Sequence, residues 1–203
     1  MKVALIGATG NAGSRVLNEL LDRGHTVTAV VRRTERVPAH ERVTAVATDG
    51  SQESLARAIA GHDAVVSSVR FVDLAPEVLV AAVKASGVKR YVVVGGAGSL
   101  LHPDGIEEAR RPEFPEPFRP NSLRGGDLLN LLRKSPELEW TFISPSRMFR
   151  PGERTGTFRY GKDHMLMNAE GQPTAISFED FALALVDELE TPKHVRERFT
   201  IGY

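Results

Sequence analysis

The sequence lacks cysteine altogether, and its formal charges cancel. Among the 203 residues, 26 Lys and Arg balance 26 Asp and Glu, which leaves a net charge of zero. Without cysteine there is no disulfide framework, thiolate metal site or cysteine nucleophile, so any redox chemistry needs a bound cofactor. Zero net charge supplies no long-range field that would attract a nucleic acid. We therefore expect no nucleic-acid partner.

Long apolar runs and metal-binding patterns are missing as well. No window approaches the roughly 18–20 apolar residues of a membrane-spanning helix. The apolar run at residues 3–6 is too short for a secretory signal. The six histidines are scattered and show no H-E-x-x-H spacing, so no metal site is expected. These absences are compatible with the cytosol. We expect a cytoplasmic protein with a small-molecule substrate and no membrane partner, present as a monomer or homodimer.

Short β-branched runs alternate with longer amphipathic segments along most of the chain. The predicted strands are residues 3–6, 26–31, 43–47, 64–69, 91–94 and 140–143. The predicted helices are residues 13–22, 51–60, 76–86, 123–134 and 178–190, the last opened by the capping box Ser177-Phe-Glu-Asp180. Continuous apolar runs are typical of strands that are covered on both faces. The alternation therefore predicts an α/β fold, with a doubly wound parallel sheet and helices on both faces.

A glycine loop joins the first predicted strand to the first helix. It has the spacing G-x-x-G-x-x-G, and we expect Gly7, Thr9, Gly10, Asn11, Ala12 and Gly13 to bind a cofactor. Glycines permit a tight turn and close approach of the backbone, and the helix N-terminus offers free N–H groups to a pyrophosphate. The alternative is a glycine-rich turn without a ligand. The strand before the loop and the helix after it favour a dinucleotide.

The end of the second predicted strand selects between dinucleotides. Arg32 and Arg33 stand 19 and 20 residues after Gly13, where an acid would bond the ribose of NAD. Guanidinium groups bind a phosphate as a fork, so NADP(H) is favoured over NAD(H). Two solvated arginines at a strand end are the alternative interpretation.

Further cofactor contacts are expected where the other strands end. Asp49 and Gly50 are placed to meet the adenine amino group. Ser67, Ser68 and Val69 are placed beneath the adenosine ribose. Gly95, Gly96, Pro145 and Ser146, after the fifth and sixth strands, complete the predicted set.

Two long loops interrupt the alternation, at residues 95–120 and 144–161. The first holds five prolines, and the second holds Pro145, Pro151, Gly152 and Gly156. Long irregular segments are uncommon in compact domains unless they are functional, and both loops follow strand ends. We expect loops 95–120 and 144–164 to form the substrate pocket of a single NAD(P)-binding domain, residues 1–203. Ordinary surface loops are the alternative. Within the second loop, Glu153 and Arg154 are expected to pair with each other.

Several segments carry a resemblance to a known family. They are GATGNAG, VVVGGAGSL, WTFISPSRMFRPGERTG and SFEDFALALVDELETPKHVRERFTIGY. Together they resemble the small NAD(P)H-binding members of the atypical short-chain dehydrogenases/reductases, related to NmrA-like proteins, flavin reductases and biliverdin-IXβ reductase. The resemblance implies a Rossmann-like sheet of strand order 3-2-1-4-5-6 with room for a seventh strand, bound NAD(P)H, and reductase activity.

The sequence departs from this family where the chemistry takes place. None of its tyrosines has a lysine four residues later, so the Tyr-x-x-x-Lys pair is missing. Gly96 and Arg147 stand where the biliverdin-IXβ reductases carry a serine and a histidine. Arg147 is the first candidate for stabilising negative charge on an acceptor, and Ser99 and His102 are candidate proton donors.

Two classes of function remain open. The first is an NADPH-dependent oxidoreductase that transfers hydride to a small planar acceptor, such as a quinone or a flavin, with FMN or FAD as substrate. The second is a non-catalytic NADP(H)-binding regulator of the NmrA-like type. The missing Tyr-Lys pair favours this alternative, because a regulator needs no catalytic acid. A nucleotide-sugar epimerase is disfavoured, because such enzymes need that pair and a larger C-terminal domain.

Overall fold

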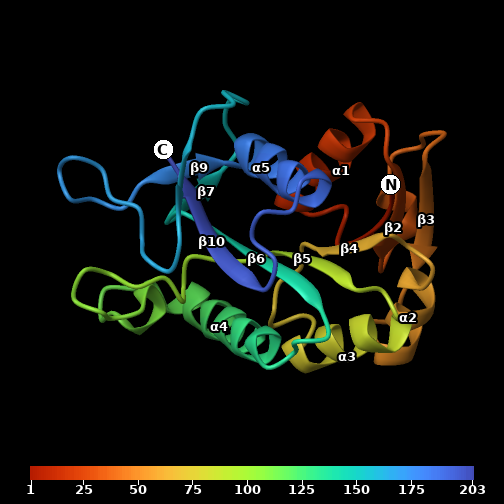
Figure 1. The fold of residues 1–203 in the computed structure, drawn as a ribbon, viewed down its shortest axis with the longest axis horizontal. Coiled ribbons are helices and arrows are strands. Elements are labelled where there is room, and N and C mark those ends of the chain that lie inside the picture. Colours follow the sequence, from red (N-terminus) through yellow and green to blue (C-terminus); the bar gives the residue numbers. More distant parts are fainter.

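The computed structural model describes all 203 residues and is built on an eight-stranded sheet (Figure 1). The strands are β1 (Lys2–Ile6), β2 (Thr26–Val31), β3 (Val43–Ala47), β4 (Ala64–Ser67), β5 (Arg90–Val94), β6 (Glu139–Pro145), β8 (Arg159–Gly161) and β10 (Glu197–Gly202). They lie in the order β3-β2-β1-β4-β5-β6-β10-β8, and only the pair β10–β8 is antiparallel. The predicted order 3-2-1-4-5-6 is confirmed, and β10 is the seventh parallel strand.

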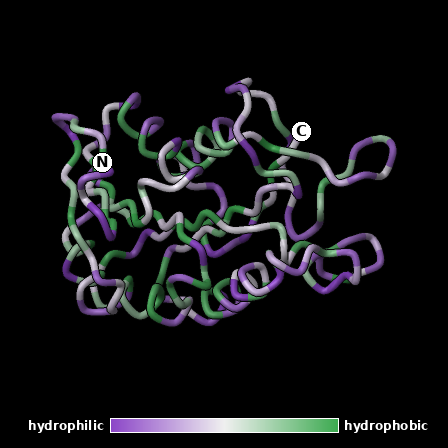
Figure 2. The backbone as a smooth tube through the Cα atoms, turned by 180° about the vertical axis from the view of Figure 1, so that it is seen from behind, coloured by the Kyte–Doolittle hydropathy of each residue, from purple (hydrophilic) through white to green (hydrophobic).

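Helices cover both faces of the sheet. They are α1 (Asn11–Asp22), α2 (Gln52–Ile59), α3 (Pro76–Ser86), α4 (Arg119–Arg133) and α5 (Phe178–Glu190). α1 packs against α5 on one face, while α2, α3 and α4 follow one another across the opposite face (Figure 1). Each face has its own apolar core, of 26 and 20 buried residues, and Figure 2 shows the hydrophobic residues concentrated in the middle of the molecule. Burial on both faces explains the continuous apolar character of the strands.

The short elements beyond the regular alternation were not predicted. A second, two-stranded sheet pairs β7 (Met148–Arg150) with β9 (Ala175–Ser177), and β8 is an edge strand of three residues. Three 3₁₀ turns, η1 (Thr34–Arg36), η2 (Glu108–Arg110) and η3 (Glu116–Phe118), lie in connections. Segments of three residues carry too little periodicity to be recognised, because their pairing partners are distant in sequence.

Two element boundaries also differ from the prediction, for tertiary reasons. β6 extends to Pro145 because β10 pairs alongside it as far as Ile201. α4 begins at Arg119 rather than at residue 123, with Pro120 in its first turn, where the proline's missing N–H costs nothing.

One of the two hydrogen bonds of the predicted capping box at the start of α5 is present, and the reciprocal one is absent. The Ser177 hydroxyl accepts the N–H of Asp180 at 2.9 Å, as a cap should. The Asp180 carboxylate does not reach back to Ser177; it accepts hydrogen bonds from Thr155 Oγ1, Gly156 N–H and the Tyr203 hydroxyl. Burial alone would raise the pKa of Asp180, but these hydrogen bonds hold it below its usual value. The residue therefore ties the loop after β7 to the start of α5.

None of the helices has the length and apolar character that a membrane span requires. No group of three or more His, Asp or Glu side chains is arranged to hold a metal ion.

A buried ion pair joins the sheet to α5. Arg90 on β5 donates to Glu188 Oε1 at 3.2 Å and to Thr141 Oγ1 at 2.7 Å. The side chains of Arg90 and Glu188 are only 7% and 4% exposed. Glu188 also accepts the N–H groups of Lys193 and His194, so one carboxylate organises the turn between α5 and β10.

We predict that Glu188→Ala destabilises the protein by about 3–5 kcal/mol, because the substitution leaves Arg90 buried without a counter-charge. Equilibrium unfolding in urea measures the change. The exposed Glu53 on α2 provides the control, and Glu53→Ala should alter stability by less than about 1 kcal/mol. Equal effects of the two substitutions would contradict this role for Glu188.

Candidate functional site

The glycine loop lies at the edge of the sheet where the parallel strands end. Gly7 has a φ of +86°, and a Cβ at this position would stand 2.2 Å from Ser68 O. A Cβ on Gly13 would stand 2.1 Å from Gly7 O. Both positions require glycine, because the loop, the start of α1 and the end of β4 are in direct backbone contact. The loop thus forms a shallow cradle made of main chain.

Helix α1 begins in this cradle without a side-chain cap. Its N-cap residue is Gly10, and the N–H groups of Asn11, Ala12 and Gly13 find no acceptor in the protein. No acidic residue stands in the first turn, and the side chain of Thr9 is exposed beside it. Free N–H groups and the positive end of the helix dipole favour an anion. The residues present therefore fit the pyrophosphate of a dinucleotide.

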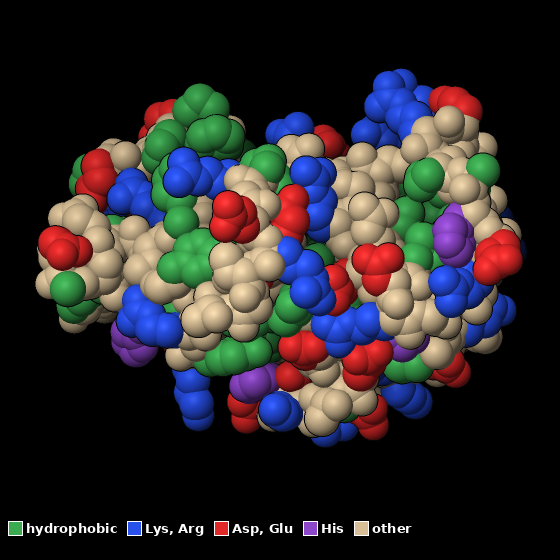
Figure 3. All heavy atoms as spheres, turned by 90° about the horizontal axis from the view of Figure 1, so that it is seen from above, with side chains coloured by type: hydrophobic (Ala, Val, Ile, Leu, Met, Phe, Trp, Pro, Cys, Tyr) green, Lys and Arg blue, Asp and Glu red, His purple; other side chains and the backbone are tan.

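The two predicted phosphate-binding arginines stand at the carboxyl end of β2. Arg32 and Arg33 are exposed, and neither is engaged by a carboxylate. Figure 3 shows Lys and Arg side chains gathered at the end of the molecule that carries β2 and β3. Beyond β3, Asp49 Oδ1 accepts the N–H of Ser51 at 2.8 Å, and this hydrogen bond holds the pKa of Asp49 below its usual value. Gly50 follows with a φ of +83°.

The three residues predicted beneath the ribose separate into two groups. The Ser67 hydroxyl is buried and hydrogen-bonds to the Tyr91 hydroxyl at 2.8 Å, so its side chain is engaged within the protein, and the placement of this residue beneath the ribose stays a prediction. β4 ends there, and Ser68 and Val69 turn against the glycines of the cradle. Their part in binding the ribose stays a prediction.

The residues predicted at the ends of β5 and β6 also differ in whether they are open to a ligand. A Cβ on Gly95 would collide with an aromatic ring of β6, whereas one on Gly96 would meet nothing within 4 Å. Pro145 is buried at the end of β6. Ser146 is buried as well, and its hydroxyl is bonded to Thr174 Oγ1 at 2.8 Å, so that side chain is not free for a cofactor. Of these four residues, Gly96 is the one with open space beside it.

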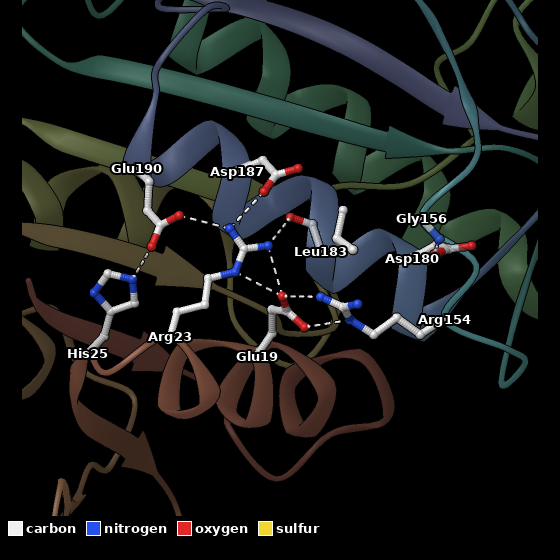
Figure 4. Close-up of polar contacts among 9 residues, drawn as sticks. All are labelled: Glu19, Arg23, His25, Arg154, Gly156, Asp180, Leu183, Asp187 and Glu190. Atoms are coloured by element: carbon white, nitrogen blue, oxygen red, sulfur yellow. Dashed lines mark hydrogen bonds and ion pairs between the residues drawn. The ribbon is translucent and has the colours of Figure 1, made fainter.

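A network of ion pairs links the loop after β7 to α1 and α5, the two helices on one face of the sheet (Figure 4). Arg154 pairs with Glu19 of α1, through Nε at 3.0 Å and Nη2 at 2.9 Å, and not with the adjacent Glu153 as predicted. Arg23 donates to Glu19 and also to Asp187 and Glu190 of α5. The hydrogen bond from Arg154, together with Arg23, lowers the pKa of Glu19 below its usual value.

A cavity of about 710 Å³ opens beside this fastened loop, bounded by the end of β7, by β9 and by Tyr203. Arg150 and Glu153 are the charged side chains that line it. Ligand pockets typically measure about 300–1,000 Å³, so a small planar molecule fits. A second hollow, of about 430 Å³, lies between Tyr160, His194 and the far end of α5, away from the glycine cradle.

The first predicted pocket loop contributes little open space. Its residues Gly98 and Ser99 border a cavity of only about 30 Å³ against α4. The Ser99 hydroxyl is buried and accepts from Arg198 Nη1 at 3.1 Å, an interaction that ties the loop to β10. We therefore assign Ser99 a structural contact, and its predicted use as a proton donor receives no support from this geometry.

The other two catalytic candidates converge on one carboxylate. His102 Nε2 lies 2.5 Å from Glu108 Oε2, and Arg147 Nε lies 2.9 Å from Glu108 Oε1. Arg147 lies two residues after the end of β6, and its side chain is 37% exposed. Glu108 was missed in the sequence, because in a charged loop it looks no different from its neighbour Glu107. Only the folded loop shows that Glu108 is buried and Glu107 is not.

Comparisons with known proteins identify the family of this chain. A family model described as NAD(P)H-binding matches residues 7–192. Protein YwnB of Bacillus subtilis, which is uncharacterized, is 38% identical to this chain over 99% of this chain and 98% of its own length.

Two solved structures extend the likeness over the whole chain. A "putative epimerase" from Bacteroides thetaiotaomicron is 43% identical with a TM-score of 0.93, covering 100% of this chain and 96% of that one. A "putative NADH-flavin reductase" from Streptococcus pneumoniae is 33% identical with a TM-score of 0.84, covering 100% and 99%. Since the family model spans nearly all of the chain, this protein belongs to the NAD(P)H-binding family, with the fold of the short-chain dehydrogenases/reductases.

Proposed function

We propose that this protein is an NADPH-dependent oxidoreductase that passes hydride to a small planar acceptor, such as a quinone or a flavin. The observation that carries the proposal is the uncapped N-terminus of α1 in its glycine cradle, with two unpaired arginines at the end of β2. The name of the Streptococcus pneumoniae relative, which refers to NADH and flavin, supports the reaction class.

The residues have distinct tasks in holding the cofactor. The N–H groups of Asn11, Ala12 and Gly13 donate to the pyrophosphate, and the guanidinium groups of Arg32 and Arg33 bind the 2′-phosphate as forks. Bound NADPH supplies the hydride. The open position at Gly96 leaves space at the ends of β5 and β6, where this fold places the reacting ring.

The acceptor side of the site supports transfer to a small molecule. The cavity beside the loop after β7 is of suitable size, and the loop that walls it is held by Glu19 and Asp180. Because these contacts hold the loop in place, less entropy is lost when the acceptor is oriented for hydride transfer. Arg147 supplies a partly exposed cation at the end of β6, where negative charge on an acceptor would be stabilised.

Epimerisation, the reaction to which the name of the Bacteroides thetaiotaomicron relative refers, suits this chain less well, because a nucleotide-sugar epimerase needs the Tyr-Lys pair. Tyr91 is buried and bonded to Ser67, and burial raises its pKa, so it cannot serve as the acid of a Tyr-Lys pair. Tyr160 lies on the edge strand β8, near α5. The Tyr203 hydroxyl is committed to Asp180.

The reaction class is tested with purified protein, NADPH, and a panel containing FMN, riboflavin and naphthoquinones. We expect oxidation of NADPH above the blank, followed at 340 nm, with at least one acceptor. Tight binding of both NADPH and NADP⁺ without turnover on any acceptor would instead favour the non-catalytic regulator.

Removing the arginines should change the cofactor preference. In Arg32→Ala/Arg33→Ala we expect the KM for NADPH to rise about 10- to 100-fold, because two charge-assisted contacts to the phosphate are lost. The KM for NADH should change less than about threefold, because NADH lacks that phosphate. Steady-state kinetics with both cofactors measures the difference. An equal loss with NADH would refute phosphate recognition by this pair.

A methyl group placed in the cradle should weaken cofactor binding. A Cβ on Gly13 would stand 2.1 Å from Gly7 O, so Gly13→Ala should displace the loop and raise the Kd for NADPH at least tenfold. Gly126→Ala is the matched control, since a Cβ there meets only ordinary contacts in α4. NADPH fluorescence titration measures both variants, and unchanged binding in Gly13→Ala would contradict the cradle.

A further inference from the structure

The cavity beside the loop after β7 contains a cation that the fold itself does not use. Arg150 is the last residue of β7 and lines this cavity of about 710 Å³. Its side chain is exposed, and its guanidinium group forms neither an ion pair nor a hydrogen bond within the protein. A guanidinium group offers donors in a planar fork that matches a carboxylate or a phosphate. The free cation therefore makes the cavity suitable for an anion.

A free guanidinium group is unusual in this chain. Apart from Arg32, Arg33 and Arg36, every other arginine contacts a carboxylate oxygen or a backbone carbonyl oxygen. Those three arginines follow β2, where we expect the phosphate of the cofactor. Arg150 is thus the one free guanidinium group outside the proposed phosphate site, and it lies in a cavity of ligand size.

The small sheet gives Arg150 a defined direction. Phe149, the residue before it, packs against the ring of Phe178 with a centroid distance of 4.5 Å. Because successive side chains of a strand alternate between its two faces, Arg150 points away from that aromatic contact. Pro151 favours an extended backbone at Arg150, and β9 pairs alongside it at Ser177. The backbone that carries the guanidinium group is therefore ordered before a ligand binds.

The acidic groups around the cavity do not neutralise Arg150. Glu153 lines the cavity as well, but no ion pair joins its carboxylate to Arg150. The Asp180 carboxylate is engaged by hydrogen bonds from the loop and from the Tyr203 hydroxyl. The cavity therefore presents one free cation and one free carboxylate, and a ligand can meet each of them with a different group.

A chain of hydrogen bonds connects this cavity to the glycine cradle. Gly152, in the wall of the cavity, donates its N–H to Glu179 Oε2 at 2.9 Å. Glu179 Oε1 accepts from Arg15 Nε at 3.0 Å, and Arg15 Nη1 donates to Asn11 O at 3.4 Å. Asn11 is the first residue of α1, where we expect the pyrophosphate. The side chains of Glu179 and Arg15 thus span the distance between the cavity wall and the cradle.

We infer that this cavity selects acceptors that carry an anionic group, a phosphate or a carboxylate, and that Arg150 is the residue that binds this group. The inference rests on the proposed function and specifies its substrate class. The ring system of the acceptor lies beside the apolar residues Pro151 and Ile176, and its anionic substituent meets the guanidinium group. Glu153 repels an anion and accepts an N–H or O–H group instead, which orients the ligand.

Matched pairs of ligands test the recognition of the anion. FMN and riboflavin share a ring system and differ in a phosphate, and anthraquinone-2-carboxylate differs from 2-(hydroxymethyl)anthraquinone in a carboxylate. Their dissociation constants are measured with saturating NADP⁺, which occupies the cradle and transfers no hydride. Flavin fluorescence reports the first pair, and isothermal titration calorimetry reports the second. In the wild type we expect the anionic member of at least one pair to bind about tenfold more tightly than its neutral partner.

Arg150→Gln should remove this preference. We expect the Kd of the anionic ligand to rise about tenfold and the Kd of its neutral partner to change less than about threefold, because only the anion loses a charge-assisted contact. Arg150→Lys keeps the charge without the fork, so it should retain part of the preference. Arg57→Gln on α2, where the side chain is 76% exposed, is the control and should leave all the constants unchanged. Since Arg150 is exposed and unpaired, its variants should fold normally.

The outcomes separate the inference from the function on which it rests. Equal affinity within both pairs in the wild type would overturn the inference, and so would an unchanged preference in Arg150→Gln. A preference in one pair alone supports it and identifies the anion as a phosphate or a carboxylate. A protein that selects anionic ligands through Arg150 but oxidises no NADPH would overturn the reaction class and leave this site intact. If NADP⁺ does not bind, the proposed function fails, and the same titrations without it still test Arg150.

Discussion

The backbone contact between the glycine loop and the end of β4 fixes the geometry on which the site depends. Because Gly7 and Gly13 leave no room for a side chain, α1 starts directly at the end of β1 and lies close against the sheet. This position lets α1 pack along α5, and it leaves the first N–H groups of α1 facing outward without acceptors. The same contact thus stabilises one face of the fold and creates the anion site.

The packing of α1 on α5 also fixes one wall of the cavity beside the loop after β7. The two helices are linked through Arg23, and Arg154 extends the link to the loop after β7 (Figure 4). Asp180 holds the same loop from the start of α5. The cavity of about 710 Å³ therefore has a wall that is fastened to the helix that carries the cofactor cradle. In the function that we propose, these contacts connect the cofactor cradle to the wall of the acceptor cavity.

Three buried or nearly buried glutamates perform different tasks in this protein. Glu188 joins α5 to the sheet through Arg90, and Glu19 joins α1 to the loop after β7 through Arg154. In both cases the carboxylate faces partners that are committed to the fold. Glu108 joins the loop after β5 to the end of β6, because one of its oxygens faces His102 and the other faces Arg147. Each of the three carboxylates thus links segments that are distant in sequence.

The sequence by itself determined the alternation of strands and helices and the glycine cradle, and its resemblance to a known family implied the strand order. The alternation and the cradle follow from signals carried by neighbouring residues: continuous apolar runs, helical periodicity, capping residues and glycine spacing. The tertiary structure alone decided which side chains are free. It turned the hydroxyls of Ser67, Ser99 and Ser146 into the interior, paired Arg154 with Glu19, and buried Glu108 between His102 and Arg147. The direction of a side chain at the end of a strand, and its partner across the fold, depend on contacts between segments distant in sequence, so no local pattern records them.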